Sequence, residues 1–242
     1  MRGKADNVKS CLVVFLGKVE YPDALELQMR VCDAKKQGFA EDVLLLLEHP
    51  PTITLGRNGK WGNLLVSDAV LAAQGVRKFE VDRGGDITFH GPGQLVGYPL
   101  MKLEPGERDV HRFMRNLEDS LIGALAGYGI EAGRQGKLTG VWTKQGKIGA
   151  MGVHISRWIT RHGFALNVNT ELTFFDLIVP CGISGKGVAS MHSILGQAVD
   201  LREVAERYAP EFAVAFSRNV VWISHEDLQR KLHCHAREIP VA

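Results

Sequence analysis

The sequence lacks the features that mark several large classes of protein. No apolar stretch approaches the ~20 residues that a membrane-spanning helix needs. The N-terminal residues are polar and contain no apolar segment of the kind found in secretory signals, so we expect a cytoplasmic protein. The net charge is only +2 over 242 residues, which is too small to indicate binding to nucleic acid or to a membrane surface.

The short motifs of common nucleotide-dependent and hydrolytic enzymes are also absent. The sequence contains no G-x-x-x-x-G-K-[ST] phosphate loop, no H-E-x-x-H zinc motif and no G-x-S-x-G nucleophile motif. Cysteine is scarce, because Cys11, Cys32, Cys181 and Cys234 are widely spaced and form no C-x-x-C pair. Disulfide-stapled secreted domains are short and rich in cysteine, so we expect four free thiols in a reducing compartment.

The hydrophobic pattern indicates a mixture of strands and helices. Continuous apolar runs at residues 12–16 and 43–47 predict buried strands. Residues 138–168 are rich in Val, Ile, Trp, Thr and Gly, and they predict two or three antiparallel strands with a turn at Gln145-Gly146. Because strands and helices do not alternate strictly, we predict an α/β protein of the α+β type. Helices then pack on a mixed sheet in a single domain over residues 1–242.

Residues suited to helix starts mark three helices. Pro22 suits the first position of a helix, and Asp109 can cap a second one. Asp200 and Glu203 have the spacing of a capping box for a third helix. Pro210 lies within that third pattern and is expected to break or kink the helix.

Residues 83–98 (RGGDITFHGPGQLVGY) are the most unusual part of the chain, with five glycines in sixteen positions between strand-like runs. Glycine allows a ligand to approach the backbone closely. We therefore interpret the segment as a binding wall, in which backbone amides and Arg83 or His90 hold a ligand. The alternative is a bulged hairpin whose glycines only satisfy the geometry of its turns.

Cys181 is the candidate nucleophile. It lies in a rigid and open loop sequence (IVPCGI, residues 178–183), whereas Cys32 lies on the apolar face of a predicted helix and is expected to pack in the core. A thiol is reactive when it is accessible and partly ionised, and a nearby cation increases the ionised fraction. Lys147, at the start of an apolar run, is the candidate cation. The alternatives are an inert loop cysteine and a lysine that faces solvent.

Two further segments contain histidine. His162 precedes Gly163 at a predicted turn before a strand, where it is either catalytic or structural. The C-terminal His233-Cys234-His235 resembles a metal-binding cluster. Adjacent ligands do not easily surround one tetrahedral ion, so we expect no metal there, and a zinc protein is kept as an alternative.

Taken together, four segments resemble the lipoyl(octanoyl) transferase family, the octanoyl-[acyl-carrier-protein]:protein N-octanoyltransferases. The segments are residues 83–98, 147–150, 160–169 and 180–183, in the order found in the family, and the resemblance covers about residues 12–217. The combination is far more specific than any one segment. His154 and Ala189 depart from the pattern, in which we expect a basic residue and threonine. Neither is a candidate catalytic residue.

The resemblance implies a fold shared with lipoate ligases and with the catalytic domain of biotin ligase. It implies that Cys181 carries an acyl-thioester intermediate and that Lys147 lowers the pKa of the thiol. Small side chains at Gly149, Ala150, Gly163 and Ala165 are expected to leave room for an eight-carbon chain. The implied substrate-binding residues are Arg83, Gly84, Gly85, Asp86, Ile87, Thr88, Phe89, His90, Ile148, Gly149, Ala150, Gly163, Phe164 and Ala165. The resemblance implies no cofactor and no metal.

The implied reaction moves an octanoyl group from octanoyl-acyl-carrier protein to a lysine of a lipoyl domain, the first step of endogenous protein lipoylation in lipoate biosynthesis. The implied partners are that carrier protein, the lipoyl domains of 2-oxoacid dehydrogenase subunits and the glycine cleavage H protein. We expect Arg157 and Arg161 to form a basic patch beside the site that attracts an acidic carrier. The alternatives are an ATP-dependent lipoate-protein ligase of the same fold and a non-enzymatic module that binds carrier or lipoyl domains.

Overall fold

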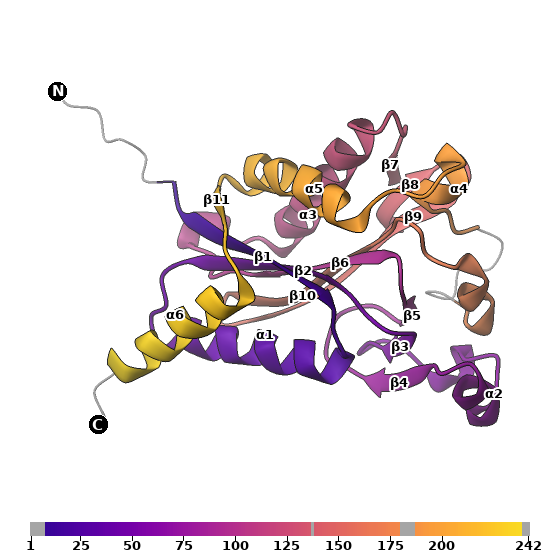
Figure 1. Cartoon of the computed structure of the whole chain (residues 1–242), viewed down its shortest axis with the longest axis horizontal. Helices are drawn as coiled ribbons and strands as arrows, with labels where there is room; N and C mark the ends of the chain where they lie inside the picture. Colours follow the sequence, from indigo (N-terminus) through magenta and orange to yellow (C-terminus); the bar gives the residue numbers. More distant parts are fainter. Residues whose placement is uncertain (1–7, 137, 180–186, 239–242) are drawn as a thin grey trace.

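The computed structural model describes residues 8–136, 138–179 and 187–238, and its largest element is an eight-stranded mixed sheet (Figure 1). The strand order is β11-β1-β2-β6-β10-β9-β8-β7. β1 runs parallel to β2 and β11, and the other neighbours are antiparallel. The bounds are β1 Ser10–Lys18, β2 Asp42–Glu48, β6 Gln94–Leu100, β7 Gly133–Gln135, β8 Leu138–Thr143, β9 Gly146–Ser156, β10 Ile159–Asn167 and β11 Asn219–Trp222.

A second sheet of three strands, in the order β4-β3-β5, lies beside the large one (Figure 1). The strands are β3 Thr52–Leu55, β4 Arg77–Glu80 and β5 Ile87–His90. β4 is parallel to β3 and β5 is antiparallel to it. The hairpin interpretation of residues 83–98 is therefore wrong, because β4 and β5 both pair with β3 and β6 belongs to the other sheet.

Helices cover both faces of the large sheet (Figure 1). α3 (Val110–Ala126) and α5 (Leu201–Phe216) pack on one face, and α1 (Tyr21–Lys36) and α6 (His225–Glu238) pack on the other. The shorter helices are α2 Asp68–Ala73 and α4 Met191–Leu195, with 3-10 turns η1 Trp61–Asn63, η2 Pro105–Glu107 and η3 Leu172–Leu177. Among the described residues, no helix is both long and apolar enough to cross a membrane.

The sequence predicted this architecture well, and the mixed sheet with packed helices is confirmed. The Asp109 side chain accepts a hydrogen bond from the Arg112 N–H at 3.0 Å, and that of Asp200 from the Glu203 N–H at 2.8 Å, so both caps form. Of the two outcomes predicted at Pro210, a break or a kink, the break is wrong, because α5 continues to Phe216. Tyr208 and Phe212, on either side of the proline, are fully buried, and their packing outweighs the backbone hydrogen bond that the proline removes.

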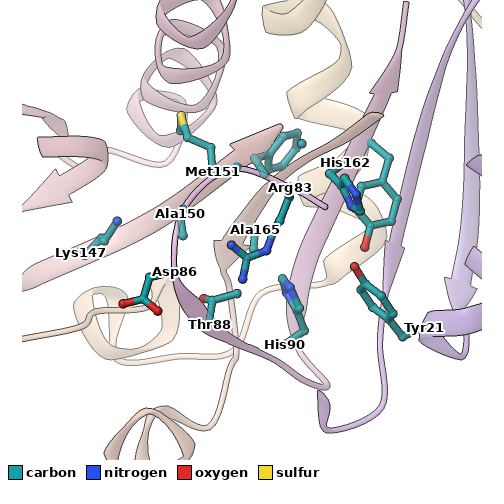
Figure 2. Close-up of a pocket in the computed structure, with 15 residues that line it drawn as sticks. Tyr21, Arg83, Asp86, Thr88, His90, Lys147, Ala150, Met151, His162 and Ala165 are labelled. Carbon is teal, nitrogen blue, oxygen red and sulfur yellow. The ribbon is translucent and has the colours of Figure 1, made fainter. Parts of the chain in front are cut away.

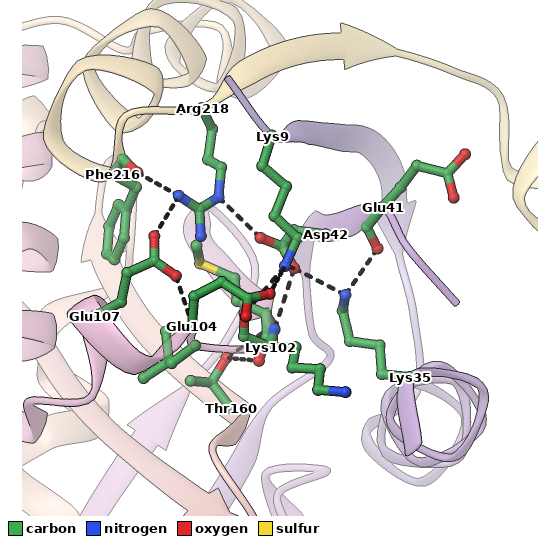
Figure 3. A network of polar contacts seen from close by, with 12 residues as sticks. Lys9, Lys35, Glu41, Asp42, Lys102, Glu104, Glu107, Thr160, Phe216 and Arg218 are labelled. Atoms are coloured by element: carbon green, nitrogen blue, oxygen red, sulfur yellow. Dashed lines mark hydrogen bonds and ion pairs between the residues drawn. The ribbon is translucent and has the colours of Figure 1, made fainter. Parts of the chain in front are cut away.

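Buried charges join the N-terminal part of β2 to the elements around it (Figure 3). The carboxylate of Asp42 is fully buried and accepts hydrogen bonds from Lys35 Nζ and from Arg218 Nε, both at 2.8 Å. Burial lowers the pKa of Lys35, although the charge of Asp42 opposes that shift. Arg218 also donates to Glu107 at 2.6 Å. The network therefore connects α1, β2, η2 and the residue before β11.

We predict that Asp42→Ala lowers the free energy of unfolding by about 3–5 kcal/mol, because it leaves two buried cations without their shared carboxylate. Urea unfolding measures the change. The matched control is Asp33→Ala, which removes the exposed pair between Asp33 and Lys36 and is expected to cost less than about 1 kcal/mol. Equal losses in the two variants would contradict the prediction.

Candidate functional site

A pocket lies between the small sheet and the large one, and it encloses about 520 Å³ of empty space that is partly open to solvent (Figure 2). β5 and the loop before it form one side, β9 and β10 form the other, and α1 contributes one ring. The lining residues are Tyr21, Arg83, Gly85, Asp86, Thr88, His90, Tyr98, Lys147, Ala150, Met151, Gly152, His162, Gly163, Phe164 and Ala165.

The alternation of side chains along β5 explains which residues of the glycine-rich wall face the pocket. Thr88 and His90 line it, because successive side chains of a strand point to opposite faces. Ile87 and Phe89 belong to a separate apolar cluster, in which the ring of Phe89 stacks on Phe174 at a centroid distance of 4.7 Å. Of the fourteen implied substrate-binding residues, Arg83, Gly85, Asp86, Thr88, His90, Ala150, Gly163, Phe164 and Ala165 line this pocket. Gly84, Ile87, Phe89, Ile148 and Gly149 do not.

Glycine allows the wall to lie directly on β9. A Cβ atom on Gly152 would stand 2.6 Å from the carbonyl oxygen of Gly84, which is closer than any real contact of that kind. The Gly84 N–H donates to the Val153 carbonyl at 2.9 Å. The loop that carries Arg83 is therefore held against the strand by backbone contacts.

The small residues of β9 and β10 serve two purposes. Ala150 lies opposite Ala165 in the register, and both line the pocket. A Cβ atom on Gly163 would overlap the carbonyl oxygen of Gly97 on β6, and one on Gly149 would meet Leu121 of α3 at 3.2 Å. The two alanines therefore give the pocket its width, whereas the glycines allow close packing of neighbouring elements.

Lys147 lies near the start of β9 at one end of the pocket, which Asp86 also lines (Figure 2). Its side chain is half-buried, and Nζ lies 5.4 Å from the centroid of the Trp142 ring, an arrangement that attracts a cation. The backbone of Lys147 is bound on both sides: its N–H donates to the Gly187 carbonyl, and its carbonyl accepts from the Ala189 N–H, both at 2.9 Å.

Cys181 lies outside the described residues, but the chain on both sides of it is anchored at this end of the pocket. The N–H of Val179, two positions before Cys181, donates to the Asn63 carbonyl at 2.8 Å. The Asn63 side chain donates to Asp86 Oδ2 at 2.6 Å. After the undescribed segment, Gly187 is bound to Lys147, as described above.

The opposite end of the pocket contains neutral aromatic side chains. Burial lowers the pKa of His162 to about 4 and that of His90 to about 3, and Tyr98 is buried. His162 Nε2 lies 2.8 Å from Asp82 Oδ1. The ring of Tyr21 lies 6.2 Å from that of His90, in a stacked arrangement. Because these imidazoles are uncharged near neutral pH, they form an uncharged wall, which fits a structural rather than an acid–base role for His162.

Sequence reasoning missed Tyr21, Met151 and Gly152 as lining residues, and it included Tyr98 only as part of the segment 83–98. Tyr21 lies at the first turn of α1, more than sixty residues before the glycine-rich wall. No local motif connects these positions, and only their contacts in the fold bring them to one pocket. Alternation along β9 gives a partial signal, since Gly152 follows Ala150 by two positions.

Arg157 and Arg161, the residues of the expected basic patch, lie on the hairpin of β9 and β10. Arg161 forms an ion pair with Asp82 and lies opposite His154 in the register. Arg157 is exposed in the turn after β9. A basic patch of these two arginines beside the site stays a prediction.

The C-terminal histidines lie on α6, away from the pocket (Figure 1). His233 and Cys234 are exposed, and the ring of His235 packs on Phe39 at 5.5 Å. Within the described ranges, no group of three or more His, Cys, Asp or Glu side chains is placed to hold a metal ion.

The fold is that of lipoate-protein ligases. A bi-partite lipoate protein ligase from Thermoplasma acidophilum superposes with a TM-score of 0.74 at 16% identity, over 95% of this chain and 91% of that chain. A lipoate-protein ligase A bound with ATP superposes with a TM-score of 0.71 at 16% identity, over 95% and 93% of the two chains.

Sequence similarity places the chain more narrowly. The family model of the lipoyl protein ligase A/B catalytic domain matches residues 20–213. An octanoyltransferase from Solibacter usitatus is 53% identical over 86% of this chain and 94% of its own length, and one from Caldicellulosiruptor saccharolyticus is 48% identical over 90% and 93%. The fold and the pocket thus define a catalytic domain of the lipoyl ligase and transferase class. Within that class, the chain belongs to the octanoyltransferase family.

Proposed function

We propose that the protein transfers an octanoyl group from octanoyl-acyl-carrier protein to a lysine of a lipoyl domain, through a thioester on Cys181. It would act in the cytoplasm as a single catalytic domain over residues 1–242. The observation that carries the proposal is the anchoring of Val179 and Gly187, which flank Cys181 in the chain, at the end of the pocket where Lys147 lies. The octanoyltransferase relatives support the reaction type.

The proposed reaction has two acyl-transfer steps. The Cys181 thiolate attacks the carbonyl carbon of the donor thioester, a new carbon–sulfur bond forms, and the carrier leaves as a thiolate that takes a proton. A neutral lysine amine of the lipoyl domain then attacks the enzyme thioester, loses a proton and forms an amide, while the Cys181 thiolate leaves. A covalent nucleophile divides one difficult transfer into two easier ones.

Lys147 would stabilise the Cys181 thiolate and exchange protons during these steps. A half-buried ammonium beside a thiol favours the charged form of the thiol, and each pKa unit corresponds to about 1.4 kcal/mol. The Trp142 ring contributes by holding the cationic side chain near the pocket. The first step requires a proton donor for the departing thiolate, and the second requires an acceptor for the amine proton, so one lysine can serve both steps.

The acyl chain would extend from Lys147 between Ala150 and Ala165 toward His162. From Lys147 to Ala150, which lies opposite Ala165, is three residues of β9, about 10 Å at about 3.3 Å per residue. This is comparable with an extended eight-carbon chain, whose seven carbon–carbon bonds are each about 1.5 Å long. Each buried methylene contributes about 0.8 kcal/mol to binding. A pocket of this length therefore favours octanoyl over shorter chains.

The fold alone does not separate transfer from ATP-dependent ligation, because a ligase bound with ATP shares it. The names of the relatives favour transfer. The test is intact mass spectrometry after the protein is mixed with octanoyl-acyl-carrier protein, without ATP. We expect the mass to increase by one octanoyl group and to return to its starting value when a lipoyl domain is added. No adduct without ATP, but transfer of free octanoate with ATP, would support the ligase instead.

We predict that Ala165→Leu lowers kcat/KM at least tenfold for an octanoyl donor and much less for a butanoyl donor. The larger side chain fills the part of the pocket beside Ala150, which the shorter butanoyl chain does not reach. Ala72→Leu, on the exposed face of α2, is the matched control and should leave both values unchanged. Equal losses for both donors would mean that the acyl chain lies elsewhere.

A further inference from the structure

A chain of buried hydrogen bonds runs beneath the pocket from Arg83 to Ala189. Arg83 Nη2 donates to Thr54 Oγ1 at 2.9 Å, and Thr54 Oγ1 lies 3.5 Å from His90 Nε2. His90 Nδ1 lies 2.8 Å from Gln94 Oε1. The chain then continues from Gln94 Nε2 to Asn167 Oδ1 at 2.9 Å and from Asn167 Nδ2 to the Ala189 carbonyl at 3.0 Å.

The two ends of this chain determine the direction of every bond within it. A guanidinium only donates and a carbonyl oxygen only accepts. Thr54 Oγ1 accepts from both Nε and Nη2 of Arg83, so its own hydrogen is directed to His90 Nε2. That nitrogen is then an acceptor, and the single ring proton of a neutral His90 is on Nδ1, which donates to Gln94.

The two amides are oriented by the same reasoning. Gln94 Oε1 accepts from His90, so both hydrogens of Gln94 Nε2 are available, and they reach the Phe89 carbonyl at 3.2 Å and Asn167 Oδ1 at 2.9 Å. Asn167 therefore accepts on its oxygen and donates through its nitrogen. Gln94 and Asn167 are buried, where an unpaired polar group costs about 1–3 kcal/mol, so reversal of any one member is strongly disfavoured.

The series of hydrogen bonds ends at the segment that holds Lys147. Ala189 accepts from Asn167 through its carbonyl, and its N–H donates to the Lys147 carbonyl at 2.9 Å. Val188 forms an isolated parallel bridge with Lys147. The position of Lys147 relative to the pocket therefore depends on five elements that these hydrogen bonds connect: β3, β5, β6, β10 and the residues before α4.

We propose that Gln94 and Asn167 are positioning residues, which hold residues 187–189 against β9 and so set the position of Lys147 relative to the acyl pocket. This inference rests on the proposed function of Lys147. Gln94 and Asn167 do not line the main pocket, although they line a smaller cavity beside it together with Lys147 and Val188. His90 has a positioning role in the same chain and does not transfer protons.

The first test does not depend on the reaction. Nitrogen-15 spectra of the uniformly labelled protein report which ring nitrogen of His90 carries the proton. We expect protonated Nδ1 and unprotonated Nε2 from pH 5 to pH 8. A proton on Nε2, or an imidazolium within that range, would overturn the proposed direction of the chain while leaving the octanoyl transfer itself untouched.

The second test uses two substitutions of Gln94. Gln94→Met removes both donors at every pH, and we expect kcat to fall ten- to a hundredfold, with KM for the octanoyl donor within about twofold. Gln94→Glu retains the acceptor for His90 but donates to Asn167 only when the new carboxyl is protonated. We therefore expect its kcat, relative to that of the original protein, to recover as pH falls. The titratable and charged groups facing this position are His90 with His49 beyond it, the guanidinium of Arg83 behind Thr54, and Lys147, which lines the same small cavity.

Gln28→Glu is the matched control. Gln28 is equally buried, its Oε1 accepts from the His162 N–H at 2.9 Å, and its Nε2 has no hydrogen-bond partner among the described residues. A carboxylate there preserves the one existing bond, so we expect unchanged kcat.

Unfolding midpoints are measured for all three variants. Original kcat values in both Gln94 variants would overturn the proposal, and so would a loss in Gln94→Glu that does not vary with pH. Absence of transfer by the original protein would instead refute the proposed function.

Discussion

Cys181→Ser is expected to lose octanoyl transfer by several orders of magnitude and to form no acyl adduct that survives isolation. A serine hydroxyl is hardly ionised near pH 7, whereas a thiol with a nearby cation is partly ionised. Removal of a nucleophile alone commonly removes nearly all of the catalysis that its group supplies. The measurements are the rate of transfer to a lipoyl domain and peptide mapping of the acylated protein.

The remaining cysteines provide the controls. Cys234 is exposed on α6, and Cys234→Ser makes the same chemical change away from the pocket, so full activity is expected. Cys11 and Cys32 are buried, and burial raises the pKa of the Cys32 thiol to about 11. Neither is therefore expected to be acylated. An adduct on Cys32, or full activity of Cys181→Ser, would overturn the assignment of the nucleophile.

Lys147→Ala is expected to lower kcat by about 10²–10⁴-fold, the usual contribution of a general acid–base group, and to raise the pKa of the Cys181 thiol. Loss of a half-buried cation removes the charge that favours the thiolate. The rate of iodoacetamide alkylation of Cys181 against pH measures this directly, and the midpoint should move upward. Lys147→Arg should not restore full activity, because a guanidinium differs in shape and does not readily give up a proton.

Lys144→Ala is the matched control for that experiment. Lys144 lies three residues earlier, is exposed and forms an ion pair with Glu131 at 2.9 Å. Its removal changes the net charge by the same amount, and we expect neither the alkylation profile nor kcat to change. An unchanged alkylation profile in Lys147→Ala would mean that Lys147 acts only on the amine in the second step.

The fold was largely predictable because its signals are local. The buried strand β2, the three antiparallel strands β8 to β10 and the caps at Asp109 and Asp200 all appear at the expected positions. Each depends on residues that are near one another in the sequence. The error at Pro210 arose because a local rule was outweighed by burial of Tyr208 and Phe212 against other elements.

The basic patch of Arg157 and Arg161 stays a prediction. The two residues lie on one hairpin, since Arg157 follows β9 and Arg161 lies within β10. Arg161 also pairs with Asp82, which comes from the loop before Arg83. This ion pair joins residues that are far apart in the sequence, so the sequence alone did not predict it.

The sequence by itself determined the family, the buried strands and the glycine-rich segment that forms one wall of the pocket. Glycine spacing, apolar periodicity and capping residues act over a few positions, so they can be read without the fold. Only the tertiary structure decided that Tyr21 and Tyr98 complete the pocket and that His90 is a neutral link between Arg83 and Gln94. Burial and hydrogen-bond partners set protonation and orientation, and both depend on residues that meet only when β3, β5, β6 and β10 have assembled.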